Sequence, residues 1–193
     1  MFRWHNARAS HLPHRSMLSS LPLPTARLAL RPFDPRSPRD CAFIVELLNQ
    51  RSFIDHIADR GVRSAEDAAR YLRESTLPMY ARHGCGMLAI ERRADGELVG
   101  MCGLLKREQL DDHDVGYALL DRHTGQGYAS EAAQAALQWG WNAFGLPRIA
   151  AFTALDNPES VRLLHKLGFR FLDIRQLTGY EDRSRYFVID APG

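Results

Sequence analysis

Residues 120–132 read Leu-Asp-Arg-His-Thr-Gly-Gln-Gly-Tyr-Ala-Ser-Glu-Ala and join an expected strand to an expected helix. The first amides of a helix have no partners inside the helix and carry the positive end of its dipole. Gly125 and Gly127 put no side chain beside these amides, and Ala129 puts only a methyl group there. The stretch therefore predicts a place where backbone amides bind a phosphate group.

Two familiar phosphate-binding motifs fit this loop poorly. A dinucleotide fingerprint needs a third glycine where the chain has Ser130, and an acidic residue about 20 positions on, where it has Pro147. The lysine of a P-loop is absent as well. A glycine turn that merely caps a helix packed on a sheet stays an alternative. The small residues of the helix over 128–144 recur at helical spacing and favour close packing on a sheet.

The flanking sequence predicts a mixed α/β domain. Strands are expected over 26–31, 87–91, 98–105, 114–120, 148–154, 169–174 and 185–189. Helices are expected over 40–50, 64–80, 128–144 and 157–167, and Pro78 should kink or end the second one. The strand–helix–strand unit from 114 to 154 needs a crossover, so its two strands should be parallel.

Length and composition indicate one folded domain. The chain has 193 residues, of which 45% are hydrophobic and 25% charged, so disorder of the whole chain is excluded. The domain is expected over 25–193. Residues 1–24 carry arginines and prolines but no acid, and we expect a disordered tail there. A later start at Met17 and a transit peptide are the alternatives.

Charge and cysteine usage narrow the class of protein. Residues 25–193 carry 22 basic and 23 acidic residues, so neither a nucleic-acid nor a membrane-surface role is indicated. No run of apolar residues is long enough to cross a membrane. Cys41, Cys85 and Cys102 are scattered, which argues against disulfides or a metal site and favours a reducing compartment.

Two motifs carry a resemblance to a known family. The run Thr124–Ala129 resembles motif A, [QR]-x-x-G-x-[GA], of the GNAT superfamily of N-acetyltransferases. The run Asn157–Phe169 is similar to N-x-x-S-x-x-L-L-x-K-L-G-F of the RimJ/RimL-like branch, which contains acetyltransferases of ribosomal-protein N-termini. Residues 59–68 also look like that branch. The resemblance covers about 25–190 with the elements in the right order.

The resemblance implies a fold and a co-substrate. The GNAT fold has one mixed, largely antiparallel sheet with helices on both faces and two splayed central parallel strands, here 114–120 and 148–154. The pantetheine arm of acetyl-CoA would lie in the gap. Asn157 would contact this arm or the thioester, or merely cap its helix. The pantetheine would pair with the backbone of Ala118, Leu119 and Leu120. The pyrophosphate would bind the amides of Gly125, Gln126, Gly127, Tyr128, Ala129 and Ser130.

The chain also departs from the family pattern. Thr124 stands where motif A usually has Gln or Arg. Leu164 stands where many members carry a tyrosine that protonates the leaving thiolate, and Ser160 is the expected substitute unless its hydroxyl only serves the helix start. His165 is expected to be exposed rather than catalytic.

No spacing marks the base that must take a proton from the amine before it attacks. Asp114 and Glu181 are the candidates, with Asp112 and His113 as further ones. The acceptor pocket could include four aromatic residues, each of which could equally belong to the core: Phe33, Phe53, Tyr117 and Tyr180.

Together these features predict a cytoplasmic, acetyl-CoA-dependent N-acetyltransferase. It would move an acetyl group to a protein N-terminus, ribosomal or other, or to a small amine, by direct attack in a ternary complex. No metal, nucleic acid or membrane partner is expected. The alternative is a non-catalytic protein that binds or senses acyl-CoA, because the tyrosine is missing and no base is marked. The oligomeric state stays open, with a homodimer as one alternative.

Overall fold

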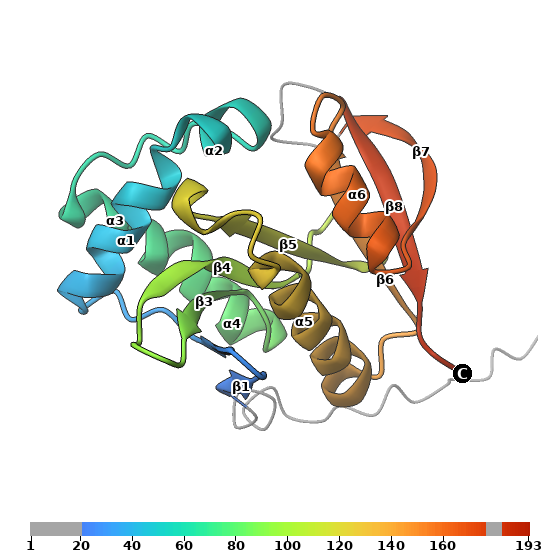
Figure 1. Cartoon of the computed structure of the whole chain (residues 1–193), viewed down its shortest axis with the longest axis horizontal. Coiled ribbons are helices and arrows are strands. Elements are labelled where there is room, and N and C mark those ends of the chain that lie inside the picture. Colours follow the sequence, from blue (N-terminus) through green and yellow to red (C-terminus); the bar gives the residue numbers. More distant parts are fainter. Residues whose placement is uncertain (1–20, 177–182) are drawn as a thin grey trace, which may run out of the picture.

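The computed structural model describes residues 21–176 and 183–193 of the chain (Figure 1). The first half contains β1 (Leu23–Pro24), β2 (Leu28–Arg31), α1 (Pro38–Leu48), α2 (Arg51–His56), α3 (Ala65–Tyr71), the π-helical turn η3 (Leu72–Thr76), α4 (Leu77–His83) and β3 (Met87–Arg92). The second half contains β4 (Leu98–Leu105), β5 (His113–Leu119), the short 3₁₀ helix η4 (Asp121–His123), α5 (Tyr128–Phe144), β6 (Arg148–Ala154), α6 (Pro158–Lys166), β7 (Arg170–Gln176) and β8 (Arg183–Asp190).

The strands form one sheet in the order β1-β2-β3-β4-β5-β6-β8-β7. Every neighbouring pair is antiparallel except β5 and β6, which are parallel. These two strands pair only where His113 faces Ile149 and Asp114 faces Ala150, and beyond that point they diverge. The predicted mixed sheet with a splayed parallel pair at its centre is therefore confirmed.

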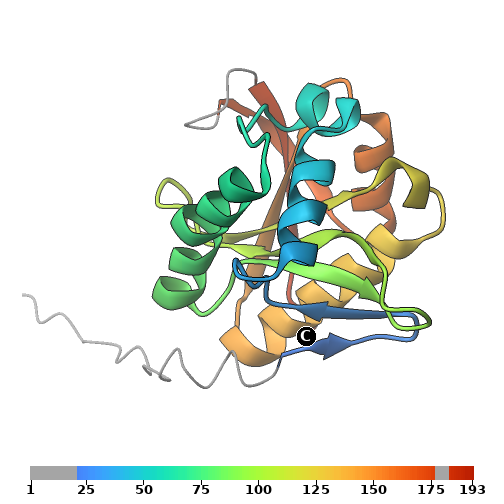
Figure 2. The same cartoon turned by 90° about the vertical axis from the view of Figure 1, so that its left-hand side faces the viewer.

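Helices cover both faces of the sheet, as expected. The buried alanines of α5 and Leu164 of α6 share a core cluster with Leu104 and Val115 of the sheet. On the opposite face, α1 and α3 share a second cluster with Ala89 and Met101. Figure 2 shows α3 and α4 (green) and α6 (orange) on opposite sides of the strands. No helix in the described part of the chain is long and apolar enough to span a bilayer.

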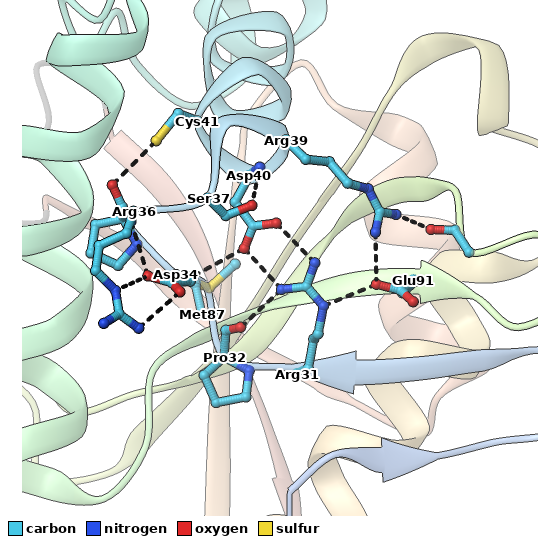
Figure 3. Close-up of polar contacts among 12 residues, drawn as sticks. Arg31, Pro32, Asp34, Arg36, Ser37, Arg39, Asp40, Cys41, Met87 and Glu91 are labelled. Carbon is cyan, nitrogen blue, oxygen red and sulfur yellow. Dashed lines mark hydrogen bonds and ion pairs between the residues drawn. The ribbon is translucent and has the colours of Figure 1, made fainter.

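A buried ion pair holds α1 against the strands β2 and β3 (Figure 3). Asp40, 1% exposed, accepts two 2.8 Å hydrogen bonds from Arg31, and Arg31 also bonds to Glu91 at 2.9 Å. Burial alone would raise the pKa of Asp40, but the bonds from Arg31 and from the Asp34 amide outweigh it and lower the pKa. Loss of Arg31 alone would leave this carboxylate buried and unpaired, which is strongly destabilising.

The sheet begins two residues before the expected domain boundary. Leu23 of β1 pairs with Leu30 of β2, and Leu21 and Leu23 pack against the core. Residues 21–24 therefore belong to the fold rather than to the predicted tail, whose first 20 residues lie outside the described part. The helix α2 was not expected, because its six residues are too few for a clear hydrophobic period.

The helix predicted over 64–80 has a different course. Ser64 and Asp67 form the expected capping box. Of the two outcomes expected at Pro78, a kink or an end, the end does not occur, because the helical segment continues to His83. Proline lacks an N–H, and its ring crowds the carbonyl four residues earlier, which disrupts α-helical bonding. The π-helical turn at Leu72–Thr76 lies just before Pro78 and takes up this disruption without ending the helix.

Candidate active site

A cavity of roughly 1210 Å³ opens where β5 and β6 diverge. Its walls come from α2, the segment from α3 to α4, strands β3 to β6, the loop before α5, and α6. Most of the residues predicted for the site line it: Asp114, Ala118, Leu119, Gly125, Gly127, Ala129, Ser130, Asn157 and Ser160. Three others, Leu120, Gln126 and Tyr128, are not among its lining residues.

The glycine loop leaves the N-terminus of α5 open. Gly127 is the N-cap with φ 80°, and no side chain caps the helix. Gly125 has φ 73°, and a Cβ built on it would meet nothing within 4 Å. Glycine adopts such left-handed backbone at little cost, whereas other residues are strained there. The first amides of α5 therefore face the cavity without a side-chain partner, as an anion-binding site requires.

Arg27 borders this loop, although the sequence did not single it out. Its Nη1 donates to the Gln126 carbonyl at 2.9 Å, and its Nε pairs with Glu131 at 2.7 Å. Its guanidinium lies 4.6 Å from the ring centroid of Tyr128. Arg27 thus fixes the loop, and its guanidinium lies beside the loop with its charge paired to Glu131. Arg27 lies about 100 residues before the glycine loop in sequence and directly precedes β2, so no local pattern could have identified it.

The three residues absent from the lining have structural roles. Leu120 is fully buried, and its amide donates to the Val99 carbonyl at 2.9 Å. Tyr128 is buried under Arg27, and the side chain of Gln126 donates to the Arg122 carbonyl. Only the backbone amides of Gln126 and Tyr128 remain candidates for ligand binding.

Strand alternation decides which backbone groups of β5 face the gap. Because Leu120 bonds to Val99 of β4, every second residue back along the strand also faces β4, which includes Ala118. Tyr117 and Leu119 then direct their backbone groups toward β6. The Leu119 carbonyl accepts a hydrogen bond from Gln50 at 3.2 Å. Of the three expected pantetheine contacts, only Leu119 therefore directs its backbone groups into the gap, and Tyr117 joins it, whereas Ala118 and Leu120 bond to β4.

Two hydroxyl groups meet in the cavity. The Ser160 Oγ lies 2.8 Å from the Tyr117 Oη, and both residues line the cavity. Asn157 caps α6 by accepting from the Ser160 amide at 2.9 Å, so the Ser160 hydroxyl is not used for capping. Burial raises the pKa of Tyr117 to about 12, and its hydroxyl is protonated at neutral pH. Leu164 lies in the core away from the cavity, and His165 is exposed as predicted.

Thr153 of β6 adds a hydroxyl that has no partner. Its Oγ1 is buried without a hydrogen bond, and the residue lines the cavity at 6% exposure. An unsatisfied buried hydroxyl costs about 1 to 3 kcal/mol. A polar group of a ligand in the gap would remove that cost, so Thr153 points to an occupant. Nothing in the sequence marked this residue.

Asp114 lies at the last paired position between β5 and β6. Burial raises its pKa, although Arg107 opposes the shift through bonds of 2.8 and 3.2 Å to the two carboxylate oxygens. A buried carboxylate with a raised pKa at the point where the strands diverge is placed to exchange a proton with a ligand. Sequence spacing alone did not distinguish it from its neighbours.

The other candidate bases lie elsewhere. Asp112 pairs with Arg148 at 2.8 Å and is not among the cavity-lining residues. His113 is also outside the lining, and burial lowers its pKa to about 4. Glu181 lies in 177–182, outside the described residues, and so does Tyr180. Phe33 and Phe53 belong to the same core cluster, and Phe53 also lines the cavity.

The cysteines offer no nucleophile in the described part of the chain. All three thiols are free and buried, and burial raises the pKa of Cys85 and of Cys102 to about 12. A thiol is nucleophilic only as the thiolate, which is scarce at such a pKa. Among the described residues there is also no group of three His, Cys, Asp or Glu side chains that could hold a metal ion.

Comparison with known proteins places this geometry in a family. The model of the acetyltransferase (GNAT) domain matches residues 27–170. The chain belongs to this family. An uncharacterized N-acetyltransferase of Bacillus subtilis, YoaA, is 35% identical over 98 residues, which are 50% of this chain and 55% of YoaA. The chain spans about half the length of the first curated relatives that it matches.

Solved GNAT structures share the fold. A GNAT-family acetyltransferase from Bacillus anthracis superimposes with a TM-score of 0.71 at 23% identity, covering 87% of this chain and 97% of that one. RimL, a ribosomal α-N-protein acetyltransferase in complex with coenzyme A, gives a TM-score of 0.66 at 18% identity and covers 87% and 97%. The expected relation to RimJ/RimL-like proteins is thus confirmed at the level of the fold.

Proposed function

We propose that this GNAT protein transfers the acetyl group of acetyl-CoA to a primary amine by direct attack in a ternary complex. The observation that carries the proposal is a continuous cavity, which runs from the uncapped N-terminus of α5 through the β5–β6 gap to Asp114. The amine belongs to a protein N-terminus or to a small molecule. The three free thiols of the protein fit a reducing compartment such as the cytoplasm.

The residues present fit acetyl-CoA along the whole length of the gap. The amides of residues 125–130 would hold the pyrophosphate, with Arg27 beside them. The backbone groups of Tyr117 and Leu119 would pair with the pantetheine as an added strand does. The free Thr153 hydroxyl would satisfy its hydrogen bond on an amide or carbonyl of the same ligand. When bound, acetyl-CoA supplies the activated acyl group.

Proton transfer is then divided between the two ends of the site. Asp114, directly or through a water, accepts the proton that the amine must lose before its nitrogen bonds to the acetyl carbon. Tyr117 would donate its proton in a hydrogen bond to the Ser160 Oγ, and the Ser160 hydroxyl would donate a hydrogen bond to the sulfur, which keeps the electron pair as the carbon–sulfur bond breaks. The hydroxyl pair replaces the missing tyrosine at position 164. Burial raises the pKa of Asp114. The acid limb of the pH–rate profile should therefore lie above pH 3.8, the ordinary pKa of an aspartate.

A non-catalytic acyl-CoA sensor is the alternative that the missing tyrosine favours. Acetyl transfer from labelled acetyl-CoA, followed by mass spectrometry, separates the two. One acceptor pool contains short peptides with free N-termini, and the other contains small amines, including amino acids, polyamines and aminoglycosides. A labelled product in either pool supports the enzyme. Binding of acetyl-CoA without any product supports the sensor and contradicts the proposal.

A further inference from the structure

The cavity has an arm on the face of the sheet that α1 to α4 cover. Side chains alternate between the two faces along each strand. Met87, Met101 and Ala118 pack with the cluster of α1 and α3. Asp114 and Gly116 lie four and two residues before Ala118 on β5, so they face the same side of the sheet. We define this arm as the acceptor chamber by six of its lining residues: Phe53, Tyr71, Met79, Met87, Met101 and Leu105.

Two glycines lie side by side under the acceptor chamber and let neighbouring atoms approach the strands closely. A Cβ on Gly103 would collide with the carbonyl oxygen of Gly86, so backbone fills that position. Gly103 of β4 faces Met87 on one side and Gly116 of β5 on the other. A Cβ on Gly116 would lie 3.3 Å from the Sδ of Met87 and 3.6 Å from Leu105. The Met87 thioether therefore extends over β4 as far as β5. Methionine is flexible and polarisable, so it adapts to apolar groups of different shape.

The roof of the acceptor chamber comes from the interrupted helix. Tyr71, Thr76 and Met79 line the cavity from the end of α3, the π-helical turn and α4. A π-helical turn changes the direction of the side chains that follow it, and such turns are frequent at functional sites. The roof thus adds an aromatic ring and a third methionine to an apolar floor.

Charge in the acceptor chamber does not suit a polycation. Two carboxylates line this side of the cavity among the described residues: Asp114, whose two oxygens both pair with Arg107, and the exposed Asp121, which accepts a hydrogen bond from Ser52 of α2. Arg60 and His56 also line this side of the cavity. A second ammonium group among the six residues that define the chamber would meet no carboxylate of theirs, because Asp114 is paired and Asp121 lies beside α2. Burying an unpaired charge is costly.

We propose that the acceptor is a primary amine carried on an apolar group, either aliphatic or aromatic. This inference rests on the proposed function. The reacting nitrogen lies next to Asp114, at the point where the strands diverge, and the apolar group occupies the acceptor chamber. The same chemistry occurs in a peptide with an apolar first residue and in a small arylalkylamine.

The test measures acetyl transfer by the wild-type protein to a series of different amines. Peptides that differ only in their first residue (Leu, Phe, Ser or Lys) form one arm, and phenethylamine, spermidine and kanamycin form the other. We expect kcat/KM to be at least about tenfold higher for the apolar acceptors within an arm. Preference for spermidine, kanamycin or the Lys and Ser peptides overturns this inference but leaves the proposed function intact. Acetyl-CoA binding without transfer to any amine overturns both.

Gly116→Val places an isopropyl group against Met87 and Leu105. We expect kcat/KM for a Phe-initiated peptide or phenethylamine to fall at least about tenfold. A Gly-initiated peptide, which leaves the chamber empty, should change less than about threefold, as should the Kd of acetyl-CoA. An equal loss for both acceptors, with acetyl-CoA binding retained, would show that the apolar group lies elsewhere and would overturn the inference.

Discussion

The two halves of the cavity are built in different ways. The half assigned to acetyl-CoA uses backbone groups from one short segment, 117–130, with the side chains of Arg27, Thr153 and Ser160 added. The acceptor chamber uses side chains from α2, α3, α4, β3 and β4, which span residues 53–105. Backbone amides offer the same chemistry in any sequence that leaves them free, so a short motif reveals them. Side chains converge only through the tertiary fold.

The largest effect is expected from a substitution that blocks the half of the cavity built from backbone groups. Gly125→Glu places a carboxylate beside the amides that are assigned to the pyrophosphate. We expect the affinity for acetyl-CoA to fall by about a hundredfold or more, because a charge is repelled at short range and the space is filled. Isothermal titration calorimetry with acetyl-CoA measures the loss.

Gly145→Glu is the matched control for that variant. Gly145 caps the other end of α5 with φ 60°, and its Cβ would also meet nothing within 4 Å. Both variants therefore carry similar backbone strain, and we expect similar losses of Tm. If Gly145→Glu weakens acetyl-CoA binding as much as Gly125→Glu, the loss comes from strain in α5, and the assignment of the loop is wrong.

The next effect concerns the hydroxyl groups of Ser160 and Tyr117. They are side chains in the half of the cavity that is otherwise built mostly from backbone groups. Ser160→Ala should lower kcat by about tenfold to a hundredfold, because a positioned proton donor is lost. Tyr117→Phe should lower it as well, since Tyr117 orients the Ser160 hydroxyl. The Kd of acetyl-CoA should stay within about threefold for both. Unchanged kcat in both variants would remove the pair from the mechanism.

Thr153→Val gives a smaller effect with opposite signs for stability and binding. The hydroxyl has no partner in the free protein, so its replacement by a methyl group should leave Tm unchanged or raise it. The affinity for acetyl-CoA should fall about fivefold, which corresponds to one lost hydrogen bond of about 1 kcal/mol. Differential scanning fluorimetry with and without acetyl-CoA reads both. A lower Tm without ligand would indicate a hydrogen bond within the protein instead.

The last effect concerns the junction of the two halves, where β5 begins, and it changes stability rather than ligand binding. Burial lowers the pKa of His113 to about 4, below its ordinary 6.5. Between pH 4 and pH 6.5 the unfolded state binds more protons at this residue than the folded state does. The contribution of His113 to the free energy of unfolding is therefore fully present above pH 6.5 and is lost as the pH falls toward 4. Thermal melts across this range should show the loss, and His113→Gln should reduce it. An equal slope in the variant would assign the loss to other groups.

The sequence predicted the fold and the open N-terminus of α5 for a physical reason. Motif A and the run from Asn157 place glycines, a cap and small residues at positions that local geometry requires. What it missed depends on distant pairing. Arg27 reaches the loop from the start of β2, and Thr153 is distinguished only by a buried hydroxyl without a partner. The π-helical turn was missed because no sequence period distinguishes it from an α-helix.

The central claim is that the two halves bind different ligands, and hydrogen–deuterium exchange with acetyl-CoA tests it most directly. Acetyl-CoA should slow exchange in peptides that cover 117–119 and 125–130. Exchange over 71–79, in the roof of the acceptor chamber, should stay unchanged. Slower exchange confined to the roof, or none over 125–130 at saturating acetyl-CoA, would contradict the account.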